Sequence, residues 1–313
     1  MKTVKSLKNK HFINLEDFTP DELKGLIDLA LELKKKIKNN KPADILKGKN
    51  LVMYFSKPSL RTRLSFEIGM AKLGGNSYVI KQDEIILGKR ESIEDTSRVI
   101  SKYADAITIR TFAHSDVETF AKYSSIPVIN ALTDLSHPCQ IMADLLTIYE
   151  TFKTYKNLKL NYVGDGNNVT NSLLTGCASF GIDITVSCPA GFEPDTNELN
   201  KAKEIAEKTG ANIEIVNDPL QGAKGADIIY TDVWTSMGQE AEYEKRKEIF
   251  KSYQINENLM NNANKNSIIL HCLPAHKGEE IDFETFEKYS APIFNQAENR
   301  MWAQMAILAS VIK

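Results

Sequence analysis

Cysteine is scarce in this sequence, and its few cysteines show no pairing pattern. The chain has four in 313 residues, at positions 139, 177, 188 and 272, and no CxxC pair. Such scattered cysteines give no support for a disulfide framework and are typical of reduced thiols. We therefore expect a cytoplasmic protein.

The sequence also lacks an excess of one charge and any long apolar run. Lys and Arg number 39 against 41 Asp and Glu, which gives a formal net charge of −2. This balance does not favour nucleic acid or an anionic membrane as a partner. No apolar run could span a bilayer, and the N-terminal MKTVKSLKNKHF lacks the apolar core of a signal peptide. We expect a protein that binds neither nucleic acid nor membranes.

What the sequence does contain is two successive series of strand-like runs separated by helical stretches. The runs are residues 51–55, 77–80, 106–110 and 127–130, and then 159–165, 183–188, 212–216, 226–232 and 266–272. Apolar residues, at 42% of the chain, are numerous enough for two cores. Such alternation predicts an α/β fold with two doubly wound parallel-sheet domains.

The domain boundary is predicted in or near a long helix of residues 137–152. We expect one domain over residues 1–140 and a second over 141–297. The final helix, residues 298–313, is expected to pack back on the first domain.

Polar side chains gather where the predicted strands end. They are Ser59 to Thr62, Arg110, His137, Gln140, Asn167, Asn168, Asp232 and His271 to Pro274. Taken singly, each has an ordinary structural explanation, such as a helix cap or a salt bridge. Ligands of open α/β sheets bind at the carboxyl ends of the strands, so the whole set favours a binding site.

The stretch SKPSLRTRLSFE, residues 56–67, joins a predicted strand to a predicted helix. If Ser59 caps that helix, the amides of Leu60, Arg61 and Thr62 face outward. A helix start with free amides is suited to phosphate, and Arg61 can add bidentate hydrogen bonds. Arg63 faces another way, and we expect it to bond within its own domain.

Six segments in order carry a resemblance to a known family. SLRTR, IRTF, LTDLSHPCQ, DVWTSMGQE, HCLPAHKGEE and AENRMWAQ are similar to signature segments of the ornithine carbamoyltransferases. SxRTR and HPxQ mark the wider aspartate/ornithine transcarbamoylase superfamily, whereas DxxxSMG and HCLP are specific to the ornithine branch. The resemblance extends from Asp17 to the C-terminus.

The resemblance implies transfer of a carbamoyl group from carbamoyl phosphate to the δ-amine of L-ornithine, in arginine metabolism. It implies an active site in the cleft between a carbamoyl-phosphate domain, residues 1–140, and an ornithine domain, residues 141–297. It also implies a homotrimer, or a multiple of trimers, without a metal or an organic cofactor.

The family's functional positions carry over to this chain one by one. Carbamoyl phosphate is expected on Ser59, Leu60, Arg61, Thr62, Arg110, His137, Gln140, Leu273 and Arg300. Ornithine is expected on Asn168, Asp232, Ser236, Met237 and Cys272. The catalytic residues implied are Arg110, His137, Gln140, Cys272 and Arg300.

Two positions depart from the family pattern. Leu60 stands where threonine is usual, which removes a hydroxyl but keeps the amide. Ile86 stands where glutamine commonly reaches the phosphate of a neighbouring subunit, and Lys89 and Arg90 follow it. Both changes bear on carbamoyl-phosphate affinity.

Three alternatives remain at this stage. VGDGNNV is half of a dinucleotide-binding fingerprint, but Val169 replaces the third glycine and no acidic residue ends the next strand. His271, Cys272 and His276 could form a metal site, although their spacing fits no zinc module. The third is a non-catalytic relative, which the changes at Leu60 and Ile86 would suit.

Overall fold

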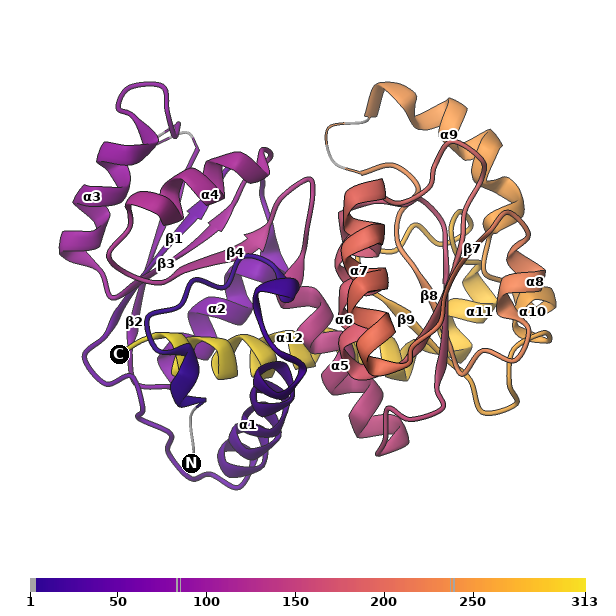
Figure 1. Ribbon diagram of the computed structural model, residues 1–313, viewed down its shortest axis with the longest axis horizontal. Coiled ribbons are helices and arrows are strands. Elements are labelled where there is room, and N and C mark those ends of the chain that lie inside the picture. Colours follow the sequence, from indigo (N-terminus) through magenta and orange to yellow (C-terminus); the bar gives the residue numbers. More distant parts are fainter. Residues whose placement is uncertain (1–3, 83, 85, 237, 239) are drawn as a thin grey trace. The chain divides into compact units, whose positions relative to one another are not determined.

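The structure, a computed structural model, describes residues 4–82, 84, 86–236, 238 and 240–313. The chain divides into two compact units. Unit 1 comprises Met1–Leu146 and Glu298–Lys313, and unit 2 comprises Thr147–Ala297. Each unit contains one sheet of parallel strands with helices packed around it (Figure 1), which confirms the predicted α/β fold class.

Unit 1 holds a four-stranded sheet in the order β2-β1-β3-β4. Its strands are β1 (Asn50–Phe55), β2 (Asn76–Lys81), β3 (Ala106–Arg110) and β4 (Val128–Leu132). Its helices include α1 (Pro20–Lys38), α2 (Leu60–Lys72), α3 (Ile93–Tyr103) and α4 (His114–Tyr123), and α5 (Pro138–Phe152) begins in it. The strand β3 is buried along its whole length, as expected of the interior of a parallel sheet.

Unit 2 holds a five-stranded sheet in the order β7-β6-β5-β8-β9. Its strands are β5 (Lys159–Val163), β6 (Asp183–Ser187), β7 (Ile213–Val216), β8 (Ile228–Thr231) and β9 (Ile268–His271). Its helices are α6 (Asn168–Phe180), α7 (Thr196–Thr209), α8 (Pro219–Ala223), α9 (Tyr243–Phe250), α10 (Glu257–Met260) and α11 (Phe283–Lys288). Every strand-like run predicted from the sequence overlaps one of these strands.

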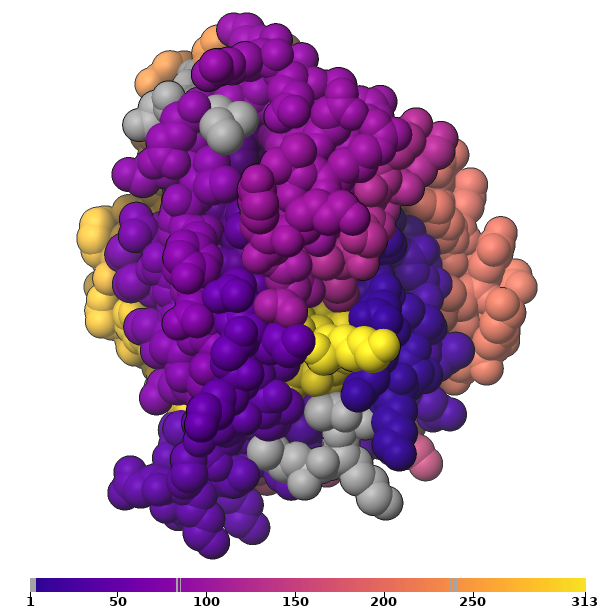
Figure 2. Space-filling model, turned by 90° about the vertical axis from the view of Figure 1, so that its left-hand side faces the viewer, coloured from indigo at the N-terminus to yellow at the C-terminus, as the bar shows by residue number. Residues whose placement is uncertain are grey.

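The last helix is longer than the sequence predicted. We expected it to begin at residue 298, but α12 spans Ser290–Val311. Pro292 lies in its first turn, where proline needs no amide partner and helps to start a helix. The C-terminal end of α12 is buried in unit 1, where the amide of Asn9 donates to the Val311 carbonyl. Figure 2 shows this yellow end lying among indigo N-terminal residues.

Both sheets have a topological switch point, where successive connections leave in opposite directions. In unit 1 it lies between β1 and β3, and in unit 2 between β5 and β8. Open α/β sheets bind ligands in the crevice at such a point. Ser59 follows β1 and Arg110 is the last residue of β3, whereas Asn168 and Asp232 follow β5 and β8.

Candidate functional site

The start of α2 presents donors that are suited to an anion. Ser59 caps the helix, because its Oγ accepts from the amide of Thr62 at 3.3 Å and donates to Thr62 Oγ1 at 2.9 Å. The Thr62 amide is thus already used, which corrects the expectation of three free amides. Within the described residues, the amides of Leu60 and Arg61 have no acceptor in the protein.

Arg63 bonds within its own domain and the side chain of Arg61 bonds to none of the described residues, as the sequence predicted. The Nε of Arg63 lies 3.2 Å from both carboxylate oxygens of Glu67, one turn further along α2. The Arg61 side chain makes no hydrogen bond or ion pair with any part of the chain that the structure describes. Arg61 is therefore a cation at a capped helix start that is available to a ligand.

Thr62 connects this helix start to two buried arginines of unit 1. Arg300 Nη2 donates to Thr62 Oγ1 at 2.9 Å, and Arg300 Nη1 donates to Gln140 Oε1 at 2.7 Å. Arg110, the last residue of β3, lies 3.5 Å from the same hydroxyl. The Gln140 amide group donates in turn to Asp144. Because α12 begins at Ser290, Arg300 lies inside that helix and not at its start.

His137 lies beside these arginines and is uncharged at neutral pH. Its side chain is buried directly before α5. Burial lowers the pKa of His137 well below its usual value, and the charges of Arg300 and Arg110 lower it further. Its neighbour Cys139 is chemically inert, because burial raises the pKa of that thiol to about 12. We call residues 59–62 together with Arg110, His137, Gln140 and Arg300 the anion half-site.

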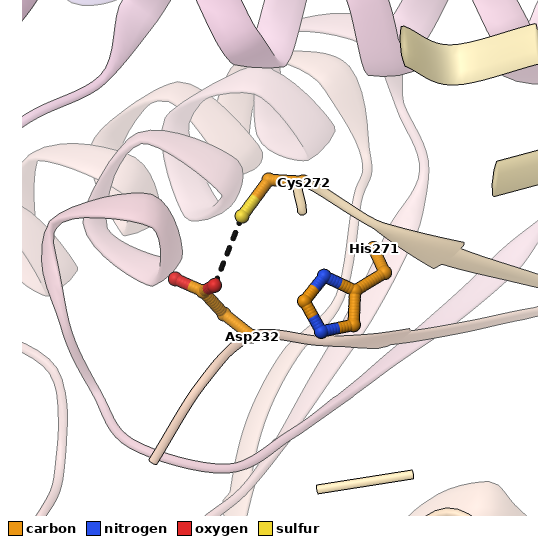
Figure 3. Close-up of side chains that lie close together, drawn as sticks. All are labelled: Asp232, His271 and Cys272. Carbon is orange, nitrogen blue, oxygen red and sulfur yellow. Dashed lines mark hydrogen bonds between the residues drawn. The ribbon is translucent and has the colours of Figure 1, made fainter. Parts of the chain in front are cut away.

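Unit 2 assembles a second group around Asp232, which follows β8. Figure 3 shows the Cys272 thiol directed at this carboxylate, with Sγ 2.9 Å from Oδ1. The other oxygen, Oδ2, accepts from Asn167 Nδ2 at 3.1 Å. Asn167 itself caps α6 through the amides of Val169 and Thr170. The carboxylate of Asp232 is therefore held in a fixed orientation.

The turn after β9 is fixed by His271. The amide of Leu273 donates to His271 Nδ1 at 2.9 Å, and His271 Nε2 lies 3.0 Å from Glu280 Oε1. These contacts assign the proton to Nε2. They also hold Leu273 in a left-handed conformation, with φ of 58°. We call Asn168, Asp232, Ser236 and Cys272 the amine half-site.

A buried arginine ties the segment after β8 to the segment after β5. Arg246 Nη1 donates to Asp165 Oδ2 and to the Trp234 carbonyl, both at 2.9 Å. Its guanidinium also lies over the rings of Phe192 and Phe250. These contacts fix the backbone that leads to Ser236.

The metal alternative is disfavoured by what His271 already contacts. Ligand atoms of Asp232, His271 and Cys272 lie within 4.8 Å of one another, and those of His276, Glu279 and Glu280 form a separate group. Both ring nitrogens of His271 have partners in the protein. The histidine is therefore not free to bind a metal together with Asp232 and Cys272.

The dinucleotide alternative is disfavoured by the loop after β5. A Cβ on Gly166 would lie 2.3 Å from the backbone of Glu193 and Pro194, and the Gly166 amide already donates to Phe192. This glycine permits contact between two parts of the protein, and its amide is not available to a pyrophosphate.

The predicted site residues fall into these two groups except for Leu273 and Met237, and Leu60 belongs to the anion half-site through its amide alone. Leu273 lies in unit 2, so it is not part of the group in unit 1 where carbamoyl phosphate is expected. Met237 lies outside the described residues. Leu60 contributes only its amide, because its side chain is 71% exposed and carries no polar atom.

Sequence reasoning missed the residues that orient the others. They are Asp144, Asp165, Arg246 and Glu280, together with the role of Asn167 on Asp232. Asn167 alone had a local signal, since asparagine before a helix is a preferred cap. The others act through contacts between segments that are distant in the sequence.

Comparisons with known proteins match two parts of the chain to one family. Residues 10–150 match the family described as aspartate/ornithine carbamoyltransferase, carbamoyl-P binding domain. Residues 156–311 match the Asp/Orn binding domain of the same family.

Similar proteins are found at full length. The ornithine carbamoyltransferase of Geobacillus stearothermophilus is 48% identical over 312 residues, which is 100% of both chains. That of Pyrococcus horikoshii is 46% identical, covering 99% of this chain and 98% of its own. The solved ornithine carbamoyltransferase from Pyrococcus furiosus superposes with a TM-score of 0.95 at 44% identity, over 100% of this chain and 99% of its own. The chain belongs to the aspartate/ornithine carbamoyltransferase family.

Proposed function

We propose that this protein transfers the carbamoyl group of carbamoyl phosphate to the δ-amine of L-ornithine, giving L-citrulline and phosphate in arginine metabolism. The observation that carries the proposal is the presence, in one chain, of an anion half-site and an amine half-site, each at a topological switch point. Ornithine specificity is supported by the relatives, which are named ornithine carbamoyltransferases.

The anion half-site is suited to carbamoyl phosphate. Arg61 and the amides at the start of α2 would hold the phosphate, since charged donors bond phosphate oxygens strongly. Arg110 and neutral His137 would donate to the carbonyl oxygen as the carbon becomes tetrahedral. Gln140 Oε1 already accepts from Arg300 but has a second lone pair for the carbamoyl NH2.

The amine half-site is suited to ornithine. Asp232, Asn168 and Ser236 would hold its α-amino and α-carboxylate groups, and Met237 is proposed from its place in the motif. Cys272 would meet the side-chain amine. Attack by the neutral δ-amine forms a C–N bond, the C–O bond to phosphate breaks, and the amine loses a proton. Positioning and electrostatics supply this catalysis.

The first test is a citrulline assay with carbamoyl phosphate and ornithine. We expect turnover that depends on both substrates. A folded protein that binds both substrates and forms no citrulline would establish the non-catalytic alternative.

The pH dependence follows from the charge of the nucleophile. A lysine-like amine has a pKa of about 10.4, so only a small fraction of ornithine is reactive at neutral pH. We expect kcat/KM for ornithine to rise from about pH 6 to about pH 9. His137 does not contribute to this rise, because its lowered pKa leaves it neutral throughout. A flat profile at saturating carbamoyl phosphate would contradict the proposed chemical step.

Substitution of His137 tests whether this residue acts as a neutral hydrogen-bond donor or is the group that titrates in the pH profile. The variant His137→Asn should lower kcat by about 100-fold, as for loss of one oxyanion donor. The slope of the pH profile should remain as in the wild type. Disappearance of the rise in this variant would identify His137 as the titrating group and refute its assignment as a neutral donor.

We also propose a homotrimer or a multiple of trimers. One exposed face of α2 carries Leu60, Leu64 and Ile68, which are 71%, 42% and 45% exposed at helical spacing. Tyr78 on β2, an edge strand, is 56% exposed. Exposed apolar side chains that share one helix face are typical of an interface.

Charge on that face should prevent assembly. We expect Ile68→Glu to convert the trimer to monomers in light scattering, because the glutamate would be buried without a partner. The control is Phe294→Glu in unit 2, where Phe294 is 58% exposed. Loss of assembly in both variants, or in neither, would count against α2 as the contact.

A cytoplasmic location is proposed on the state of the thiols. All four cysteines are free in the structure, as in proteins of reducing compartments. No helix in the described part of the chain is long and apolar enough to cross a membrane.

A further inference from the structure

A buried lysine directly precedes the helix start that is suited to phosphate. Lys57 stands between β1 and Ser59, and its side chain is only 4% exposed. Its Nζ lies 2.5 Å from Asp134 Oδ1 and 3.9 Å from the centre of the Phe112 ring. Lysine is almost never buried unless it is paired.

The partners of Lys57 come from the two other segments of the anion half-site. Phe112 follows Arg110 at the end of β3, and Asp134 follows β4 and precedes His137. Lys57 belongs to the segment that follows β1, and its ammonium group contacts the segments that follow β3 and β4. Each of these segments carries residues proposed to bind carbamoyl phosphate.

Backbone hydrogen bonds join the same three segments. The amide of Ser56 donates to the Arg110 carbonyl at 2.8 Å, and that of Thr111 donates to Leu132 at 3.0 Å. The amide of Asp134 donates to Phe112 at 2.9 Å. These bonds set the spacing of the strand ends, and Lys57 adds side-chain contacts to Phe112 and Asp134.

The burial of this charge has a cost that packing alone does not explain. Removing an ammonium group from water is unfavourable, and an apolar residue of similar length would fill the space without that cost. Asp134 is 58% exposed, so its charge alone does not require a buried partner. The charge orients the Lys57 side chain, because the ammonium group pairs with one carboxylate and lies over one aromatic ring.

We propose that Lys57 is a positioning residue, which sets the relative placement of Arg61, Arg110 and His137 before carbamoyl phosphate binds. This inference rests on the function proposed above. Lys57 acts through its contacts with Asp134 and Phe112, and the substrate is bound by the residues that these segments carry.

The chain offers a matched control at the opposite end of the same sheet. Lys49 Nζ lies 3.0 Å from Asp105 Oδ1, and these two residues precede β1 and β3. Lys57→Met should raise KM for carbamoyl phosphate and lower kcat, changing kcat/KM by about 10- to 100-fold, since small misplacements at a site have effects of this size. Lys49→Met should leave both values close to wild type. The KM for ornithine at saturating carbamoyl phosphate should change little in either variant.

A second variant keeps the test decisive if Lys57→Met does not fold. Asp134→Asn changes a mostly exposed group, and we expect the same rise in KM for carbamoyl phosphate, to a smaller extent. In the double variant the two effects should be less than additive, because both remove one interaction. Equal losses in Lys57→Met and Lys49→Met, or an unchanged KM for carbamoyl phosphate in Lys57→Met and Asp134→Asn, would overturn the proposal.

Binding of inorganic phosphate separates this inference from the proposed function. Isothermal titration of the wild type and of the lysine variants needs no turnover. Weaker phosphate binding only in Lys57→Met supports the positioning role even if no citrulline is formed. Unchanged phosphate binding with normal citrulline formation would remove the positioning role and leave the proposed function intact.

Discussion

Replacement of Arg61 by alanine should lower kcat/KM for carbamoyl phosphate by about 100- to 1,000-fold, a loss comparable to removing one strong transition-state donor. Arg61 has no hydrogen bond or ion pair with the described residues, so the protein loses no internal polar contact and should stay folded. In binding alone, a charged hydrogen bond to phosphate is worth about 1.5–3 kcal/mol. Steady-state kinetics and thermal unfolding, measured together, distinguish a lost ligand contact from a lost fold.

Arg63 provides the control for this substitution. It has the same side chain on the same helix, but it is paired with Glu67 and exposed. An exposed pair of this kind contributes about 0.3–0.5 kcal/mol. Arg63→Ala should therefore keep nearly full activity. Near-normal turnover of folded Arg61→Ala would refute the assignment of this helix start to phosphate.

The capped start of α2, which we propose binds phosphate, could be predicted because its causes are local. A serine before a helix, followed by Leu60, Arg61 and Thr62, fixes a cap and directs the amides by chain geometry alone. The placement of the candidate site residues at one edge of each sheet was also predictable, because parallel strands bring their carboxyl ends to one edge. Asp232 and Cys272 met for this reason, although β8 and β9 are separated in the sequence.

The residues that orient the site could not be predicted, because their contacts depend on sheet order and register. Lys57 in the sequence looks like any surface lysine, and only the pairing of β1 with β3 and of β3 with β4 brings Phe112 and Asp134 to it. Glu280 likewise gains its role when the turn after β9 directs His271 toward it. The spacing of residues along the sequence predicts neither contact.

The start of α12 was missed for a different reason. The AENRMWAQ segment drew attention to residue 298, whereas the helix signal lies earlier, at Ser290 and Pro292. A functional motif therefore marked a site residue, Arg300, and did not mark a helix boundary. Leu60 is a similar case, because its position in the motif predicted a binding residue although only its backbone amide can bind a ligand.

The largest effect is expected in the choice between ornithine and putrescine. Putrescine carries the reactive amine but lacks the α-carboxylate. Asn168 and Ser236, the groups proposed to bind that carboxylate, would find no carboxylate on putrescine to recognise. Sites built around such groups discriminate against analogues that lack them by about 10,000-fold. We expect kcat/KM for ornithine to exceed that for putrescine by about this factor.

Ser236→Ala tests whether the segment after β8 is the source of this preference. It should lower kcat/KM for ornithine and leave kcat/KM for putrescine nearly unchanged. The ratio of the two specificity constants should therefore decrease. Arg246 supports this expectation by donating to the carbonyl of Trp234, two residues before Ser236. Comparable specificity constants for the two amines in the wild type would refute the assignment of carboxylate recognition to Asn168 and Ser236. An equal loss for both amines in Ser236→Ala would show that the hydroxyl acts on the common amine and not on the carboxylate.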